Sequence, residues 1–455
     1  MIHSERIVVL YDSITNSVFI SQVLLPLIQW LSADKKRTAT IISFEAIDTT
    51  DHSARAYIAR EKRITLVIYK RLPFFGLPTL WYAAYCISNI VKHKKDARVI
   101  ARGPFAGYAC LLARIQNALI IQIRGLLWHE YEYIYKHRHQ QNNQTTNPYT
   151  TALRKSESVG KLKVAWTTIN FTRWLCQIHY KPCPLIGQKF PFSKKPLAHN
   201  ANRSNALRCK RIKKFLTHMR HARAALHYRL KLFLYKQLET TLYAQQNIST
   251  LTFEAVSPAL RDHLITTYST LKPETITLAY DDIPQPIEHK KRKLWRRQTR
   301  AELGIAADAL VYCYNGSSKP WQCPVDFFTF CRGEIATNMN AHLLVLSQDS
   351  EQFKKLLTTT DIPTERYHLV CVEHDAIYRY MAAADIGLVF RQATLLNWVS
   401  RPTKLLEYQA VGLQIIHNAT IAWLAESARN QQRYNAPCVQ SPHLASELVN
   451  GQDKQ

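Results

Sequence analysis

Short apolar runs alternate with helix-like segments along most of the 455-residue chain. In the first half, segments 18–31, 80–92 and 108–115 are expected to be helical and lie between runs that resemble buried strands. Uninterrupted apolar strands separated by helices are typical of a parallel sheet covered on both faces. The strands predicted for this sheet cover residues 6–10, 38–44, 64–69, 97–101, 119–123, 251–256 and 274–279.

A second alternating half follows the polar, Pro- and Lys-rich segment 281–295, which we interpret as a linker. The expected fold class is α/β, with two Rossmann-like, doubly wound domains facing across a cleft, at 1–278 and 279–455. No G-x-G-x-x-G sequence is present, so a dinucleotide site is not indicated. In the second half, strands are predicted at 309–314, 341–346, 367–372, 386–390 and 413–417, and helices at 325–331 and 375–384.

The alternation breaks down over residues 136–205, which contain two polar stretches at 140–151 and 193–204. We interpret this region as an insertion or lid of the N-terminal domain. The following segment, 207–242, is long, basic and helical in spacing. Its charge could contact phosphates or a membrane surface, or it could simply form a solvated face.

Segment 397–417 has the features of a loop, a helix and a short buried strand. Pro402 fits the first turn of the helix, and Gly412 fits the left-handed position just past its end. In a doubly wound sheet, such a helix start favours an anion such as a diphosphate. Lys404 would add a cation there, and Glu407, one turn on, would offer a carboxylate to hydroxyl donors. The alternative is that both are solvated charges on an ordinary helix.

The formal net charge is +27, from 60 Lys and Arg against 33 Asp and Glu. Such an excess attracts polyanions, which include nucleic acid, anionic lipid headgroups and phosphorylated substrates. The alternative is a generally basic proteome. The basic runs lack the interleaved aromatic residues of a base-stacking platform, so no nucleic-acid partner is expected.

The ten cysteines are scattered, with no CxxC spacing and no cluster that would suggest a metal site. Together with an N-terminus that lacks the layout of a signal peptide, this indicates a reducing, cytoplasmic compartment. No uninterrupted apolar run is long enough to span a bilayer. Segment 72–91 comes nearest and is expected to be a buried helix with its lead-in, with an interfacial helix as the alternative.

Several stretches match one family pattern in order and spacing. They are Arg102-Gly-Pro-Phe-Ala-Gly107, Ile121-Gln-Ile-Arg-Gly125, Ala255-Val-Ser257, Tyr312 to Gly316, Ala382-Ala-Ala-Asp-Ile-Gly-Leu-Val-Phe-Arg391 and the stretch from Asn397 to His417. Together they resemble retaining glycosyltransferases of group 1, the family-four type with the GT-B fold, and most closely those of bacterial surface-polysaccharide synthesis. Residues 136–205 are not covered by the resemblance.

The resemblance implies a nucleotide-sugar donor held mainly by the C-terminal half. Arg391 and Lys404 would face the diphosphate, where fixed cations stabilise the charge of the leaving group. Glu407 would bind the ribose hydroxyls. Further implied donor contacts are Gly316, Ser317, Lys319, Asn397 and Thr403. Arg102, Arg124 and Glu130 are implied on the acceptor side, with His129 a weaker candidate.

The same resemblance implies front-side displacement, with retention of configuration and without any cofactor or metal. The implied acceptor is a glycan or a lipid-linked glycan, and a peripheral contact with an anionic membrane on its cytoplasmic face would suit the positive charge. The competing hypothesis is a catalytically silent GT-B protein that acts as a basic scaffold on membranes or nucleic acid.

Three positions depart from the family pattern. Val399 stands where the first glutamate of the paired-glutamate motif would fall. Ser317 replaces the usual arginine after the glycine, and Gln322 replaces the lysine expected a few residues later. Lys319, Arg391 and Lys404 could replace the missing cations, whereas no residue is evident that replaces the carboxylate.

Overall fold

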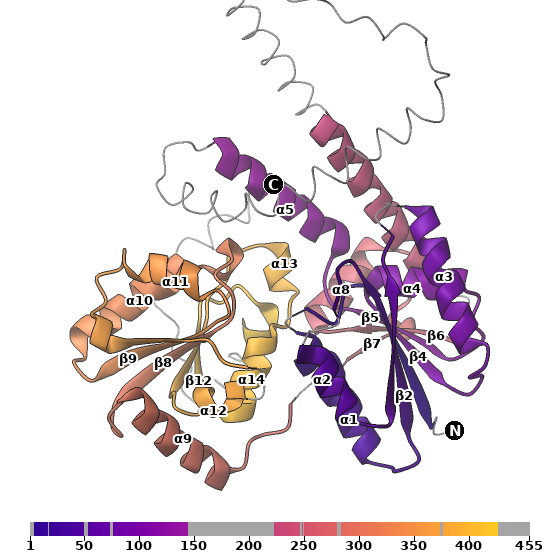
Figure 1. The fold of residues 1–455 in the computed structure, drawn as a ribbon. Helices are drawn as coiled ribbons and strands as arrows, with labels where there is room; N and C mark the ends of the chain where they lie inside the picture. The colour runs from indigo at the N-terminus through magenta and orange to yellow at the C-terminus, as the bar shows by residue number, and fades with distance from the viewer. Residues whose placement is uncertain are drawn as a thin grey trace, which may run out of the picture. The chain divides into compact units, whose positions relative to one another are not determined.

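The computed structural model describes residues 4–16, 18–49, 53–72, 76–143, 223–245, 248, 250–279, 284–373 and 376–425. The chain forms two compact units, of which the larger combines Met1–Leu126 with Leu238–Gln455 and the smaller is Leu127–Gln237. The larger unit contains two parallel sheets with flanking helices (Figure 1). The α/β class expected from the apolar pattern is therefore confirmed.

The first sheet has seven parallel strands in the order β3-β2-β1-β4-β5-β6-β7. Its order reverses between β1 and β4, which is the kind of switch point where doubly wound sheets bind ligands. The predicted strands match those observed to within one or two residues, which is the usual uncertainty of element ends. The observed strands are β1 (Glu5–Leu10), β2 (Thr38–Glu45), β3 (Ile64–Lys70), β4 (Arg98–Arg102), β5 (Leu119–Ile123), β6 (Leu251–Ala255) and β7 (Ile276–Leu278).

Helices and turns connect these strands. Segment 18–31 forms a short π-helix, η1 (Ile20–Leu24), continued by α1 (Leu25–Ser32). The expected helix at 108–115 begins earlier, because Gly103 at φ +82° turns the chain directly out of β4 and Pro104 fits the first turn. The other elements of this part are α2 (Ser53–Ala59), α3 (Leu77–Val91), α4 (Gly103–Leu112), α8 (Pro258–Thr267) and η2 (Pro273–Thr275).

The second sheet has five parallel strands in the order β10-β9-β8-β11-β12 and again reverses, between β8 and β11. Separate apolar clusters cover its two faces, one of them rich in Tyr and Phe. The strands are β8 (Leu310–Asn315), β9 (Ala341–Leu346), β10 (Tyr367–Val370), β11 (Ile386–Val389) and β12 (Gln414–His417). The helices are α9 (His289–Leu303), α10 (Pro324–Thr337), α11 (Ser350–Leu357), α12 (Ile377–Met381), α13 (Leu395–Trp398) and α14 (Thr403–Val411), with short turns η3 (Pro320–Gln322) and η4 (Thr364–Arg366).

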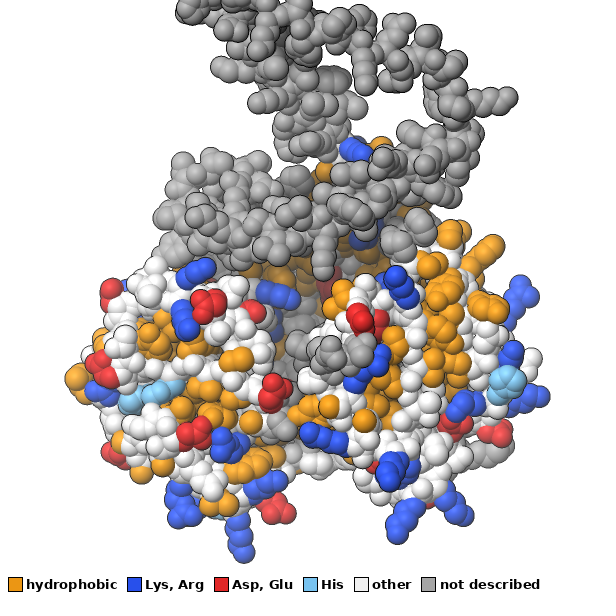
Figure 2. Space-filling view, in the orientation of Figure 1, with side chains coloured by type: hydrophobic (Ala, Val, Ile, Leu, Met, Phe, Trp, Pro, Cys, Tyr) orange, Lys and Arg blue, Asp and Glu red, His pale blue; other side chains and the backbone are white. Residues whose placement is uncertain are grey.

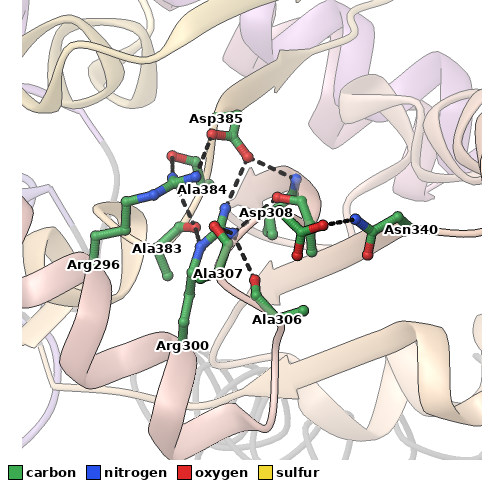
Figure 3. A network of polar contacts seen from close by, with 11 residues as sticks. Arg296, Arg300, Ala306, Ala307, Asp308, Asn340, Ala383, Ala384 and Asp385 are labelled. Atoms are coloured by element: carbon green, nitrogen blue, oxygen red, sulfur yellow. Dashed lines mark hydrogen bonds and ion pairs between the residues drawn. The ribbon is translucent and has the colours of Figure 1, made fainter.

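The interpretation of 281–295 as a linker is wrong for its second half, which is part of α9. Further along α9, beyond residue 295, two arginines contact the protein instead of facing solvent. Arg300 donates to the carbonyls of Ala306, Ala307, Ala309 and Ala383 at 2.8–2.9 Å. Figure 3 shows Arg296 and Arg300 pointing from α9 toward the segment that ends in Asp385, which pairs with both at 2.7 and 2.9 Å. These partners anchor α9 to the second sheet.

The helix predicted around Pro402 is confirmed, with a small correction at its start. Pro402 is extended (φ −63°, ψ 134°) and caps α14 instead of lying in its first turn. Gly412 has φ +77° and ends the helix in the expected left-handed conformation. Among the described residues, no helix is long and apolar enough to cross a membrane.

The smaller unit contains α5 (Leu127–Asn143) and residues 223–237, which are also helical. Aromatic rings join these two segments, and the rings of Tyr135 and Tyr228 stack with centroids 3.5 Å apart. Lys236 lies over the ring of Trp128 at 4.0 Å. Most of the proposed insertion 136–205, and residues 207–222 of the predicted basic helix, lie outside the described residues.

Candidate functional site

A cavity of about 700 Å³ opens in the larger unit at the carboxyl ends of β8, β9 and β11. Part of its wall comes from Ile14, Thr15 and Asn16, which follow β1. Most of the predicted donor-side residues line it. They are Gly316, Ser317, Lys319, Arg391, Thr403, Lys404 and Glu407.

Lys404, in the first turn of α14, lies against the cavity and is only 6% exposed. Its ammonium donates to Gln322 Oε1 at 2.7 Å and lies 4.0 Å from the centroid of the Tyr314 ring. Burial lowers the pKa of this ammonium well below its usual value, and the nearby Arg391 lowers it further. A solvated helix charge is therefore excluded for Lys404.

Glu407 is also buried, one turn further along α14. Its Oε2 accepts a hydrogen bond from Asn315 Nδ2 at 2.7 Å. Burial raises the pKa of this carboxyl to about 7, although Lys404 and Asn315 both favour the ionised form. Within the described residues, no carboxylate lies within 4.0 Å of the Lys404 ammonium. The two charges thus share the cavity without forming a closed ion pair.

Arg391 follows β11 and supplies the second cation. Its carbonyl accepts from Asn418 Nδ2 at 2.6 Å and from Thr420 Oγ1 at 3.2 Å, which fixes the backbone. Its Nε is buried and has no hydrogen-bond partner among the described residues. Burial lowers the pKa of the guanidinium. A buried donor beside a second cation creates a position that favours an anion.

The turn after β8 brings backbone close to these cations. Gly316 has φ +143°, and a Cβ there would lie 3.0 Å from Lys404 Nζ. The turn is held by Asp349, which accepts from Ser318 N at 2.9 Å and from its hydroxyl at 3.1 Å. Gln322 Nε2 donates to Ser317 Oγ at 3.0 Å. Glycine therefore keeps open a space that any other residue would fill.

Sequence reasoning missed the residues that position this site. Gln322 was noted only as a missing cation, yet it holds the Lys404 ammonium. Asn315 and Asp349 are polar residues at or just after strand ends, and this location was a usable signal. Glu45 is buried at the end of β2 and accepts from Ile14 N at 2.9 Å, which anchors the loop that lines the cavity.

Three of the other predicted residues lie elsewhere in the larger unit. Asn397 is buried and donates to the Gln392 carbonyl at 2.9 Å, so it supports the loop before α14. Arg102 lines a separate cavity of about 40 Å³ and donates to Gln22 Oε1 at 2.6 Å. Arg124 contacts the Gln22 carbonyl at 3.4 Å. These contacts favour an organising role for the two arginines.

Glu130 and His129, the remaining acceptor-side candidates, lie in the first turn of α5 in the smaller unit. The Glu130 side chain is exposed. The ring of His129 stacks on that of Trp128, with centroids 3.5 Å apart. Their assignment to the acceptor side stays a prediction.

Val399, at the position of the missing glutamate, is 1% exposed. Its carbonyl accepts from Ser257 Oγ at 2.6 Å. Ser257 also caps α8 through a hydrogen bond from Leu260 N at 3.0 Å. The residue is packed within the protein and is not among those that line the cavity.

Two glycines of the matched motifs have packing roles. A Cβ at Gly387 would lie 2.4 Å from the ring of Tyr408, so only glycine lets that ring pack on β11. A Cβ at Gly107 would lie 2.8 Å from Ile121 on the neighbouring strand β5. These two motif positions therefore reflect the packing of the fold and do not indicate a function.

No family model matches the chain, and no curated protein matches it in sequence. Solved structures do match. WaaG, a glycosyltransferase involved in lipopolysaccharide biosynthesis, is 13% identical with a TM-score of 0.51, over 98% of this chain and 88% of that one. The chain has the GT-B fold. Anabaena HepE in complex with UDP (12% identity, TM-score 0.48, 92% and 82% covered) and a Rickettsia africae glycosyltransferase (9%, 0.47, 91% and 79%) are also similar.

Where the structure describes side chains, no three His, Cys, Asp or Glu residues lie close enough together to hold a metal ion. The charged groups that line the cavity include Arg391, Lys404 and Glu407, beside the backbone at Gly316.

Proposed function

We propose that the protein is a glycosyltransferase that moves a sugar from a nucleotide-sugar donor to a glycan or lipid-linked acceptor with retention of anomeric configuration. One observation carries the proposal. The half-buried Arg391, whose Nε is buried, and the buried Lys404 line one cavity at the carboxyl edge of the second sheet, together with the buried carboxylate of Glu407. Two cations suit a diphosphate, and a carboxylate suits the hydroxyls of a ribose.

Without a bound anion, the arrangement of the two cations is energetically costly. Two neighbouring buried cations repel each other, and each loses hydration. A bound diphosphate would supply the missing negative charge and accept hydrogen bonds from Arg391 Nε and Lys404 Nζ. The space left by Gly316 would let a phosphate oxygen approach the backbone. Of the other predicted donor contacts, Ser317, Lys319 and Thr403 line the same cavity.

For the chemical step, the proposed reaction is front-side displacement. The acceptor hydroxyl oxygen bonds to the anomeric carbon as the bond from that carbon to the phosphate oxygen breaks. The hydroxyl proton passes to the departing phosphate. Lys404 and Arg391 stabilise the charge that develops on the diphosphate, and Glu407 orients the nucleoside. No metal enters these steps.

Because WaaG, a glycosyltransferase of lipopolysaccharide biosynthesis, shares the fold, a surface glycan is the acceptor class that we propose. The compartment that we propose is the cytoplasm. The net charge of +27 favours substrates that carry phosphate, both in the donor and in a lipid-linked acceptor.

The first experiment is titration calorimetry of the full chain with UDP, GDP and ADP. We expect one nucleotide to bind. Glu407→Ala should weaken that binding by about tenfold or more, because the ribose hydroxyls of the nucleotide lose a charged acceptor. Glu351→Ala is the matched control, because this glutamate is exposed on α11 and pairs only with Lys354 among the described residues. It should leave the affinity unchanged.

The nucleotide that binds then selects the sugar donors for a transfer assay, in which the product anomer is read by NMR. Absence of binding by all three nucleotides would contradict the proposal at the donor site. Binding without transfer or hydrolysis of any donor would instead favour the silent GT-B scaffold. An inverted product would overturn retention alone.

A further inference from the structure

The connection between β1 and β2 contains the π-helix η1, directly before α1. Leu25 N donates to Ile20 O, five residues back, as π-helical geometry requires. Pro26 accounts for this turn, because proline has no N–H and its ring would collide with an α-helical carbonyl at Gln22, four residues earlier. Such turns are rare and occur often at functional sites. The turn leaves the Gln22 carbonyl to be bound by side chains from outside the helix.

Those side chains are two arginines at the carboxyl ends of β4 and β5. Arg102 Nη1 and Arg124 Nη2 contact the Gln22 carbonyl at 3.5 and 3.4 Å. Arg102 Nη2 also donates to Gln22 Oε1 at 2.6 Å. The Lys and Arg side chains visible in Figure 2 are scattered over the surface, whereas Arg102 is only 6% exposed. A cation so far removed from water needs acceptors, and Gln22 supplies two oxygens for it.

The other end of the Gln22 amide reaches the second half of the chain. Its Nε2 donates to Thr403 Oγ1, in the first turn of α14. Thr403 lines the cavity of about 700 Å³ and directly precedes Lys404, one of the cations proposed to hold the diphosphate. Gln22 itself lines the small cavity beside Arg102. One amide thus links the arginines of the first sheet to the start of the helix that carries Lys404.

These contacts need a side chain that offers a donor and an acceptor at the same time. A glutamine amide gives its oxygen to Arg102 and an N–H to Thr403, and it adds no charge beside the buried guanidinium. Hydrogen bonds in such a chain polarise and strengthen one another. A displacement of Arg102 would therefore weaken the bond that holds Thr403.

We propose that Gln22 is a positioning residue for the transfer step. It holds the first turn of α14, and with it Lys404, in a fixed relation to Arg102, and so couples the predicted acceptor side to the diphosphate site. The effect on catalysis rests on the proposed glycosyltransferase function, whereas the hold on α14 does not. Nucleotide affinity should depend little on Gln22, because Gln322 holds the Lys404 ammonium from within the second half.

The first test is the kinetics of Gln22→Met, which keeps the length of the side chain and removes its hydrogen bonds. With the nucleotide sugar that the wild type uses, kcat should fall by about 10- to 100-fold, because small misplacements of reacting groups are costly. The Kd for the nucleoside diphosphate should change by less than about threefold. Gln22→Glu should recover part of kcat, because its carboxylate accepts from Arg102 and from the Thr403 hydroxyl. Gln29→Met, at an exposed position of α1, is the matched control and should behave like the wild type.

Hydrogen exchange tests the hold on α14 without any substrate. The backbone amides of residues 405–408 should exchange about tenfold faster in Gln22→Met than in the wild type or in Gln29→Met. Thr403→Val, which removes the same bond from its other end, should have a similar effect. The double variant should exchange little faster than either single variant, because the two changes break one contact.

Circular dichroism and thermal unfolding establish that every variant keeps the fold. Exchange in Gln22→Met that matches the wild type would overturn the proposal, as would an unchanged kcat. Equal losses of kcat and nucleotide affinity would also overturn it and assign Gln22 to nucleotide binding. A wild type that binds no nucleotide would contradict the proposed function and the catalytic part of this proposal, whereas faster exchange in Gln22→Met would still support the hold on α14.

Discussion

Two groups of cations in the second half of the chain, each with one buried member, Arg300 or Lys404, differ in the partners that satisfy them. Around α9, Arg300 is surrounded by backbone carbonyls and pairs with Asp385, which also pairs with Arg296 and accepts from Val311 N (Figure 3). At the cavity, Arg391 keeps a buried Nε without a partner among the described residues. In the described part of the chain, the Lys404 ammonium has an amide oxygen and a ring as its contacts.

The difference shows that a buried cation does not by itself indicate a ligand site. The α9 group is complete, with acceptors placed by the fold, and it stabilises the packing of α9 on the sheet. The cavity group is incomplete and its cations repel each other, so it gains by binding an anion. Substitutions in the first group should act on folding, and those in the second on ligand affinity.

Asp385→Ala should have the largest effect on stability. It leaves Arg300 buried without its counter-ion and Val311 N without its acceptor, so we expect a loss of about 3–5 kcal/mol in the free energy of unfolding. Urea denaturation measures this loss. Asp385→Asn keeps an oxygen for Val311 N and should lose less. A loss below about 1 kcal/mol for the alanine variant would show that the α9 group is not an anchor.

Lys404→Met should act in the opposite way. We expect the affinity for the bound nucleoside diphosphate to fall by about 100-fold, because a charge-assisted contact in a buried site is lost. Stability should stay unchanged or rise by about 1 kcal/mol, since an unpaired buried ammonium is removed and Gln322 Oε1 keeps the Tyr314 hydroxyl 2.8 Å away. Calorimetry and urea denaturation give the two quantities.

Lys355→Met is the control for that prediction, because this lysine is exposed on α11. It should change neither affinity nor stability. If Lys404→Met unfolded the protein as readily as Asp385→Ala, the contrast between the two cation groups would fail.

The two groups also differ in how well the sequence predicts them. Helix spacing and end signals were enough to place Lys404, Glu407 and Gly412, because these features are local. The partners Gln322 and Asn315 lie 82 and 92 residues away in the chain from the groups they hold, so only the packed sheet reveals them. Composition misplaced the start of α9: Lys290, Lys291 and Lys293 are exposed, as a linker would have them, whereas the arginines that join the helix to the sheet, Arg296 and Arg300, come after the predicted linker.

Glu407→Gln should reveal the cost of the buried carboxylate through pH. Burial raises the pKa of Glu407 from its ordinary value of 4.5 to about 7 in the folded protein. Between these pH values the unfolded chain loses this proton first, so the wild type loses stability as pH rises from about 4.5 to 7. The glutamine variant has no carboxyl to ionise at this position. Its free energy of unfolding relative to the wild type should therefore rise by about 2–3 kcal/mol between pH 4.5 and 7.

Urea denaturation of both proteins at pH 4.5, 6 and 7.5 measures this difference. Glu351→Gln, at an exposed position on α11, should follow the wild type at every pH. A constant difference between Glu407→Gln and the wild type would mean that the carboxylate ionises as it does in water.

Gly316→Ala sharpens the contrast most directly, because it alters the space at the cavity and leaves every charge in place. At φ +143° a Cβ is strained, and it would lie 3.0 Å from Lys404 Nζ and 3.2 Å from Gln322 Oε1. We expect about 1–2 kcal/mol of destabilisation and a fall in nucleotide affinity of about tenfold.

Gly333→Ala, inside α10 with no atom near its Cβ, is the control and should not weaken binding. Gly316→Ala removes no charge, so the pH dependence of its stability should match that of the wild type. If the nucleotide affinity falls under these conditions, the open space beside Lys404 is part of the anion site. Unchanged affinity would place the phosphates elsewhere in the cavity.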